Sequence, residues 1–145
     1  MKTKKTLNLL RTFWKSEIIA INVYNFLAKR YRDSDKRESI IEIGKMERKH
    51  ATVWNGIAHQ YHNASFQVSL ILKFEILLMK LLARILPFTI FIHYMEHSER
   101  NAILEYARLL ETFKENESIK KMIIDVIRQE IGHECPHDTT ASRNV

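Results

Sequence analysis

The sequence predicts an all-α protein: an antiparallel bundle of four long helices, with a crossover helix between its two helix pairs. The 145 residues include only three glycines and two prolines, which favours long uninterrupted helices over hairpin-rich β folds. Apolar residues also recur at steps of three and four along four separate segments, which is the period of one face of a helix. A chain of this length is expected to form one domain with a real core.

The first helix pair is expected at residues 7–31 and 36–61. Each segment presents an almost wholly apolar stripe at helical spacing, as a helix packed against a core does. A polar turn separates the two segments, and Asp35 with Glu38 has the spacing of a capping box at the start of the second helix. The two segments are therefore predicted to be antiparallel neighbours.

A third segment, residues 66–86, is apolar on most sides and is predicted to be the crossover helix, with Ser65 as its cap. Lys73, Lys80 and Arg84 form one narrow basic stripe along it. The remaining apolar surface needs cover from the bundle, a second subunit or a membrane surface. A homodimer through this helix is the first expectation. A membrane surface is the second, because Lys and Arg side chains can extend from an apolar face toward water.

The second helix pair is expected at residues 88–113 and 119–134, with Asn116 capping the last helix. Residues 1–134 are therefore predicted to form the bundle domain. The segment 135–145 is short and polar and lacks a core pattern, so it is predicted to be a disordered tail.

Composition limits the classes of partner and site. The net charge of +6 and the pI near 9.5 are compatible with nucleic acid, an anionic membrane surface or acidic partners. The basic residues are scattered and no recognised nucleic-acid module is present, so no nucleic-acid binding is expected. The single cysteine, Cys135, excludes a disulfide framework and any metal site with four cysteine ligands. With no evident secretory signal or membrane-spanning run, a cytoplasmic location is expected, with membrane association left open.

Acidic side chains interrupt the otherwise apolar faces of the four bundle helices. Burying an unpaired carboxylate is costly, and several that repel one another would not be tolerated in a plain core. Cations held between them would relieve that cost. Carboxylates combined with imidazole suit iron or manganese, and zinc is not excluded. The inward acids are Glu17, Glu47, Glu96, Glu99 and Glu130.

Glu47 with His50, and Glu130 with His133, both have the spacing Glu-x-x-His. Residues three apart lie on the same face of a helix, so the glutamate could bridge two metal ions while the histidine binds one of them. One such motif is weak, because composition alone predicts about one in a chain of this size. Two copies in matching places of a repeated half predict a pseudo-twofold metal site, with solvated helix faces as the alternative.

This arrangement resembles the ferritin-like di-iron carboxylate bundles, which combine a glutamate from each of two helices with two Glu-x-x-His motifs. Glu96, three residues before Glu99, is similar to the additional carboxylate of rubrerythrins. Residues 81–110, with L-L-A-R-I-L-P-F and M-E-H-S-E-R-N-A-I-L-E-Y, are similar to ferritin-like domains fused to vacuolar-iron-transporter-type membrane proteins. The resemblance covers about residues 10–134.

The resemblance implies a cofactor of two iron ions, Fe²⁺ or Fe³⁺, with manganese or zinc as alternatives. Tyr24 and Tyr106 match tyrosines that hydrogen-bond the ligating carboxylates in that family. The metal ligands that the resemblance implies are Glu17, Glu47, His50, Glu96, Glu99, Glu130 and His133.

The implied function is that of a non-haem di-iron oxidoreductase of rubrerythrin type, which reduces peroxide or oxidises ferrous iron. Its substrate would be peroxide, dioxygen or ferrous iron, and an external donor would supply the electrons. One alternative is an iron-sensing or iron-delivery module that docks on a membrane transporter through residues 66–86. The other is a metal-free structural bundle.

Overall fold

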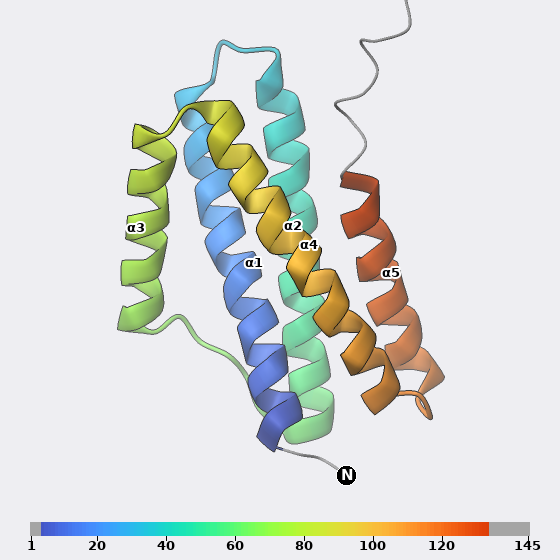
Figure 1. Cartoon of the computed structure of the whole chain (residues 1–145). Coiled ribbons are helices and arrows are strands. Elements are labelled where there is room, and N and C mark those ends of the chain that lie inside the picture. Colours follow the sequence, from blue (N-terminus) through green and yellow to red (C-terminus); the bar gives the residue numbers. More distant parts are fainter. Residues whose placement is uncertain (1–3, 134–145) are drawn as a thin grey trace, which may run out of the picture. The chain divides into compact units, whose positions relative to one another are not determined.

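The computed structural model describes residues 4–133, and within this range it contains five α-helices and no strand (Figure 1). The prediction of an all-α fold is therefore confirmed. The predicted tail at 135–145 lies outside the described residues. The helices are α1 (Lys4–Arg30), α2 (Lys36–His62), α3 (Leu70–Ile85), α4 (Phe88–Thr112) and α5 (Glu117–His133).

The chain divides into two units, Met1–His93 and Tyr94–Val145, and the boundary falls within α4. The first unit holds α1, α2, α3 and the start of α4. The second holds the rest of α4 and α5. That the two helix pairs form one ferritin-like four-helix bundle over residues 1–134 stays a prediction.

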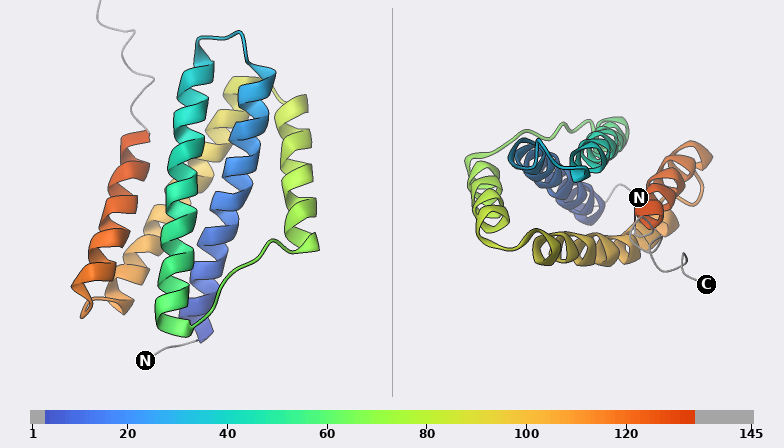
Figure 2. Two further views of the ribbon diagram at one scale, coloured as in Figure 1. Left: turned by 180° about the vertical axis from the view of Figure 1, so that it is seen from behind. Right: turned by 90° about the horizontal axis from the view of Figure 1, so that it is seen from above.

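The helices α1 and α2 pack against each other as an antiparallel hairpin (Figure 2). Both helices bury the stripe that helical periodicity marks out. At Gly44, a Cβ atom would lie 3.3 Å from the Cβ of Tyr24, so the two backbones approach each other closely there. The buried apolar residues of this hairpin include Leu10, Phe13, Trp14, Ile21, Val23, Tyr24, Leu27, Ile40, Ala51, Trp54 and Ile57.

The predicted capping box at the start of α2 is wrong. Asp35 is the N-cap residue, but its backbone is already helical (φ −55°, ψ −25°) and its side chain makes no capping hydrogen bond. A capping side chain needs an extended backbone to turn back onto the first amides of the helix. Instead, the Oγ of the preceding Ser34 accepts a hydrogen bond from the backbone N–H of Lys36 at 3.2 Å.

The predicted start of the crossover helix is also wrong, because α3 begins at Leu70 and is capped by Ser69, not by Ser65. Ser69 has an extended backbone, and its Oγ accepts a hydrogen bond from the N–H of Leu72 at 3.1 Å. Phe66 lies in the preceding loop and is buried there. Its N–H donates to Asn55 Oδ1 at 2.9 Å, which ties the loop to α2.

Polar contacts at both ends join α3 to α1. Near its start, the Lys15 ammonium lies 3.1 Å from the Glu75 carboxylate. At its end, Arg30 of α1 donates to the backbone oxygens of Ala83 at 2.7 Å and Arg84 at 2.9 Å, so it satisfies carbonyls that the helix leaves open. The third helix is thereby fixed along the side of α1.

The start of α4 is held against the α1–α2 turn by aromatic contacts. The ring of Phe88 lies edge-on to that of Tyr31, with centroids 5.0 Å apart, and the Lys36 ammonium lies 4.8 Å from the Phe88 centroid. Among the described residues, no helix is long and apolar enough to cross a membrane.

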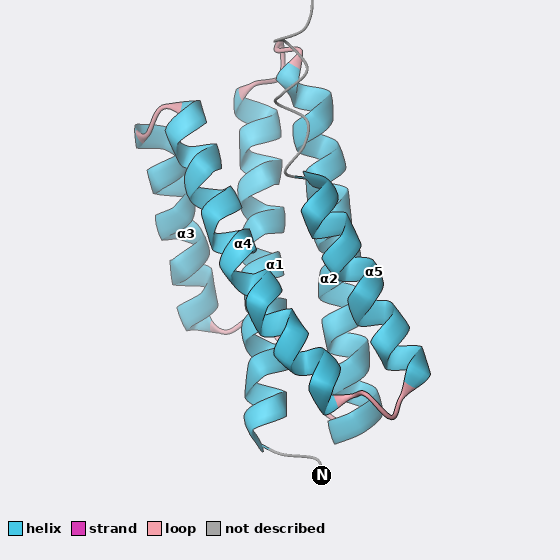
Figure 3. Cartoon of the chain, turned by 45° about the vertical axis from the view of Figure 1, so that its right-hand side comes forward, coloured by secondary structure: helices cyan, strands magenta, loops and turns pink. Residues whose placement is uncertain are grey.

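In the second unit, α4 and α5 run in opposite directions and are joined by a short loop (Figure 3). The predicted cap is confirmed: Asn116 Oδ1 accepts from the N–H of Ile119 at 3.0 Å. The helix begins two residues earlier than expected, at Glu117. The buried apolar residues of this unit include Met95, Tyr106, Leu109, Phe113, Ile119, Ile123 and Val126.

We expect two glycine substitutions in α2 to differ in their effect on stability. Gly56 is exposed and a Cβ there meets nothing within 4 Å, so Gly56→Ala should raise the free energy of unfolding by about 0.5–1 kcal/mol. Gly44→Ala gains the same helix propensity but crowds Tyr24, so its gain should be smaller or absent. Urea unfolding of both variants measures the difference. Equal stabilisation would contradict the close approach at Gly44.

Candidate metal site

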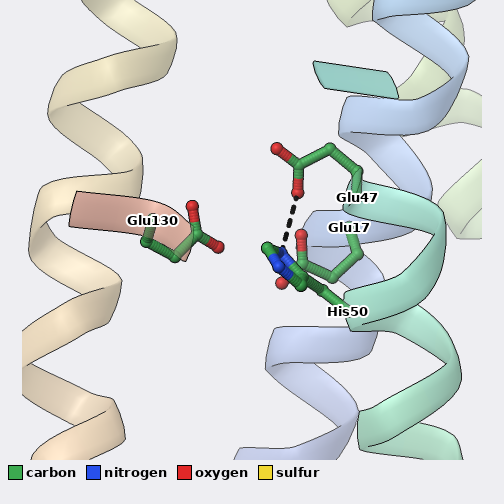
Figure 4. A group of neighbouring side chains, drawn as sticks. All are labelled: Glu17, Glu47, His50 and Glu130. Atoms are coloured by element: carbon green, nitrogen blue, oxygen red, sulfur yellow. Dashed lines mark ion pairs between the residues drawn. The ribbon is translucent and has the colours of Figure 1, made fainter. Parts of the chain in front are cut away.

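The first unit gathers three of the predicted ligands in the interior of the α1–α2 hairpin. Glu17 comes from α1, and Glu47 with His50 comes from α2 (Figure 4). Their exposed fractions are 4%, 1% and 1%. Each offers one ligand atom, and these atoms lie within 4.8 Å of one another. The group of Glu17, Glu47 and His50 is named the α1–α2 cluster below.

Helical spacing explains why the two α2 members meet. Glu47 and His50 are three residues apart, which places them on one face of α2. His50 Nδ1 lies 3.5 Å from Glu47 Oε2, an ion pair only when the imidazole is protonated. Figure 4 shows both side chains leaving α2 toward the same side as Glu17 leaves α1, so that the three ends lie close together.

Two contacts bracket the cluster along the hairpin. On one side, the rings of Phe13 and Trp54 lie 5.3 Å apart between centroids, at a tilt of 48°. On the other side lies the close approach of Tyr24 to Gly44. Because packed interiors have little free space, these contacts fix the separation of α1 and α2 at the level of the cluster.

The environment of the α1–α2 cluster is costly for charged groups. Among the described residues, the buried polar or charged side chains are those of Thr6, Glu17, Glu47, His50 and Glu130. None of these is a lysine or an arginine. Glu47 Oε1 is buried and accepts no hydrogen bond from the described part of the chain. A buried acceptor of this kind carries a desolvation penalty that a bound cation would offset.

Trp54 is a member of the site that the sequence analysis assigns only to the apolar stripe of α2. Its indole N–H donates a buried hydrogen bond of 3.0 Å to Glu17 Oε1. Hydrogen bonds from a neighbouring residue to a ligating carboxylate orient it toward the ion. The sequence contains a signal for this role: Trp54 lies four residues after His50, on the same face of the helix as the predicted ligands. A buried indole N–H needs a hydrogen-bond acceptor, and a nearby carboxylate can supply it.

These atoms fit a bound metal ion. Two carboxylates and one imidazole are an oxygen- and nitrogen-rich donor set, which divalent first-row metals accept. The α1–α2 cluster could therefore hold a metal ion.

The remaining predicted ligands belong to the second unit, and their assignment stays a prediction. Glu130, which Figure 4 also labels, is buried on α5. Glu96 and Glu99 lie on α4 and are half-buried. His133 is the last residue of α5, and its side chain lies outside the described part of the structure.

The two tyrosines predicted to support the carboxylates are buried. Tyr24 is 3% exposed on α1 and Tyr106 is 2% exposed on α4. Their burial agrees with a place in the core, and a hydrogen bond to a ligating carboxylate stays a prediction. Tyr24 also has the steric role opposite Gly44.

The chain was compared with protein-family models, curated proteins and solved structures. No protein-family model, no curated protein and no solved structure matches the chain.

We expect Trp54→Phe to destabilise the protein more than Trp14→Phe. Both changes shorten a buried indole to a phenyl ring, but only the indole of Trp54 donates a hydrogen bond to Glu17. The ring of Trp14 packs against that of Phe66, with centroids 5.6 Å apart. Losing a hydrogen bond to a buried carboxylate should cost about 1–3 kcal/mol of unfolding free energy beyond the lost volume. Urea unfolding in the presence of a chelator measures both variants, and equal losses would count against the role of Trp54.

Proposed function

We propose that the protein is a non-haem di-iron carboxylate protein of rubrerythrin type, which reduces peroxide or oxidises ferrous iron. The observation that carries the proposal is the α1–α2 cluster, with its ligand atoms within 4.8 Å of one another. The buried Glu47 oxygen that accepts no hydrogen bond supports it. A purely structural bundle would have no reason to retain these groups in its interior.

The proposal has a second half that the sequence pattern supports. The series Glu99, Glu130 and His133 repeats in the second unit the order of Glu17, Glu47 and His50 in the first. We place these residues, with Glu96, around the same pair of ions, in an antiparallel ferritin-like four-helix bundle. Iron is favoured over manganese and zinc by the resemblance to rubrerythrins and by the mixed carboxylate and imidazole donors.

The side chains of the first unit have distinct tasks in this proposal. Glu47, the first residue of the Glu-x-x-His motif, would bridge the ions. The imidazole of His50 would hold one ion from the same face of α2. Trp54 holds the Glu17 carboxylate in its orientation through the 3.0 Å hydrogen bond. The ions would supply the redox chemistry, and an external donor would supply electrons.

The apolar lining of the hairpin matters as much as the ligands. Phe13 and Trp54 close one side of the cluster and Tyr24 lies on the other, so bulk water is excluded from the ligand atoms. Exclusion of water strengthens the attraction between a cation and the carboxylates. It also limits access to small substrates such as peroxide, dioxygen or a ferrous ion.

An iron-sensing or iron-delivery module is the second candidate function. The observation that favours it is the apolar side of α3 that faces away from α1, which would serve as a docking surface. A module of this kind would bind iron in the same ligands and hand it to a transporter. It would differ from the oxidoreductase in lacking turnover.

We expect Glu47→Gln to change the stability of the protein in opposite directions with and without metal. With a chelator present, removing a buried charge should raise the free energy of unfolding by about 1 kcal/mol or more. With ferrous iron under anaerobic conditions, the metal-dependent stabilisation should shrink, because the affinity falls by at least about tenfold. Urea unfolding in both conditions gives the two quantities.

Glu42→Gln is the matched control, since Glu42 lies on the same helix, is exposed and pairs with Lys45 at 2.6 Å. It should leave the metal-dependent stabilisation unchanged. If Glu47→Gln lowered stability in chelator and kept the full response to iron, the metal-site assignment would be wrong.

We also expect two ferrous ions to bind per chain in an anaerobic titration. Addition of peroxide or dioxygen should then produce the near-ultraviolet absorbance of oxidised iron, and repeated turnover with an added reductant would identify an oxidoreductase. Glu130→Gln should reduce the stoichiometry or weaken one of the two binding steps, because it removes a proposed bridge. Glu111→Gln, at an exposed residue of α4 that pairs with Lys114, should not.

The outcomes of this titration separate the candidates. Tight binding without turnover would favour sensing or delivery. A stoichiometry of two that is unaffected by Glu130→Gln would remove the second unit from the proposed site. Absence of binding in the parent protein would leave the structural bundle.

A further inference from the structure

The helix α3 has two opposite apolar faces. One face, with Leu72, Ile76 and Ala83, is buried in the first unit. The other face consists of apolar residues at helical spacing on the opposite side of the helix. Their side chains are open to solvent, with exposed fractions between 47% and 82%. We name it the outward face of α3; it consists of Leu70, Ile71, Phe74, Leu77, Leu78, Leu81 and Ile85.

The outward face is held rigidly, because the helix is fixed at both ends. Ser69 caps its first turn through Leu72, and the Lys15–Glu75 pair joins that end to α1. Arg30 binds the carbonyls of Ala83 and Arg84 at the other end. An apolar helix face this large is not needed for packing within the first unit, which the inward face already provides. Such patches mark interaction surfaces.

The charges along α3 determine what kind of partner fits. Lys73, Lys80 and Arg84 are spaced seven and four residues apart, so they form a basic stripe along one edge of the outward face. Within α3, all of whose residues are described, Glu75 is the single acidic residue, and its carboxylate pairs with Lys15 of α1. One edge of the outward face is therefore positive.

We propose that the outward face of α3 inserts into the headgroup region of an anionic lipid bilayer, with the helix axis parallel to the membrane surface. An apolar face with Phe and Leu beside a Lys and Arg stripe is the pattern of helices that lie in a membrane interface. The leucines and Phe74 enter the acyl boundary, and Lys73, Lys80 and Arg84 reach the phosphates. The 16-residue helix lies on the membrane and does not cross it.

A second copy of the chain fits the same face less well. It would bring the same three positive side chains to the contact and no unpaired acid of α3 to meet them. An anionic surface instead neutralises all three. Charge complementarity thus favours lipid over self-association. The outward face shares no residue with the α1–α2 cluster, so its lipid binding does not depend on the proposed metal function.

The experiment is co-sedimentation of the full chain with vesicles of phosphatidylcholine, with and without phosphatidylglycerol, in the presence of a chelator. The protein should bind the anionic vesicles and bind the neutral ones far more weakly. Lys73→Gln/Lys80→Gln/Arg84→Gln should lower the partition coefficient on anionic vesicles by about a hundredfold. Phe74→Gln/Leu77→Gln should abolish binding, because it removes the centre of the outward face.

The matched control is Leu104→Gln/Ile131→Gln, which removes two other exposed apolar side chains, 69% and 51% exposed, on α4 and α5. It should bind anionic vesicles like the parent. A Phe74→Trp variant gives a local readout: its fluorescence should shift to the blue on anionic vesicles, and that of Leu104→Trp should not.

Three results would overturn the proposal. The first is absence of binding to anionic vesicles by the folded parent chain. The second is binding that survives Phe74→Gln/Leu77→Gln or that is equal on neutral vesicles. The third is a dimer that analytical ultracentrifugation detects without lipid and that Phe74→Gln/Leu77→Gln abolishes, in a protein that does not bind vesicles. The outward face would then contact a second copy of the chain.

Discussion

The desolvation of acidic side chains between α1 and α2 is the constraint on which the rest of the structure depends. Glu17 and Glu47 are removed from water together with His50, in a core that is mostly apolar. Such groups remain buried only where their interactions offset the free energy of dehydration. The hydrogen bond from the indole N–H of Trp54 offsets part of this free energy at Glu17, and a bound cation would offset the rest. The packing around the hairpin can be understood as what holds these groups in place.

Much of the fold follows from the sequence, because helical periodicity is a local signal. The stripes of α1 and α2 predict both helices to within a few residues, and the three-residue spacing predicts that Glu47 and His50 share a face. That Glu17 joins them follows from its place as the only acid on the α1 stripe. The sequence alone therefore predicts the three members of the α1–α2 cluster.

The errors have a common physical origin. Caps depend on backbone dihedral angles, and the sequence offers two adjacent candidates at α2, Ser34 and Asp35, and two nearby at α3, Ser65 and Ser69. At α3 the extended backbone is that of Ser69, and the loop before it is held by tertiary contacts such as the burial of Phe66. The role of Trp54 is missed for a similar reason, since the direction of an indole N–H depends on the register between two helices. The ligand roles of the second unit depend on its placement and remain predictions.

The absence of a side chain at Gly44 affects the width of the α1–α2 cluster indirectly, through the packing of the two helices. Gly44 precedes Glu47 by one turn, and the gap it leaves for Tyr24 sets how near two backbones come at that level of the hairpin. A cation held between the helices must match that width, since coordination distances differ between ions by only a few tenths of an ångström. If the cluster holds a cation, a substitution at Gly44 would therefore change which ion fits best, while every donor atom stays the same.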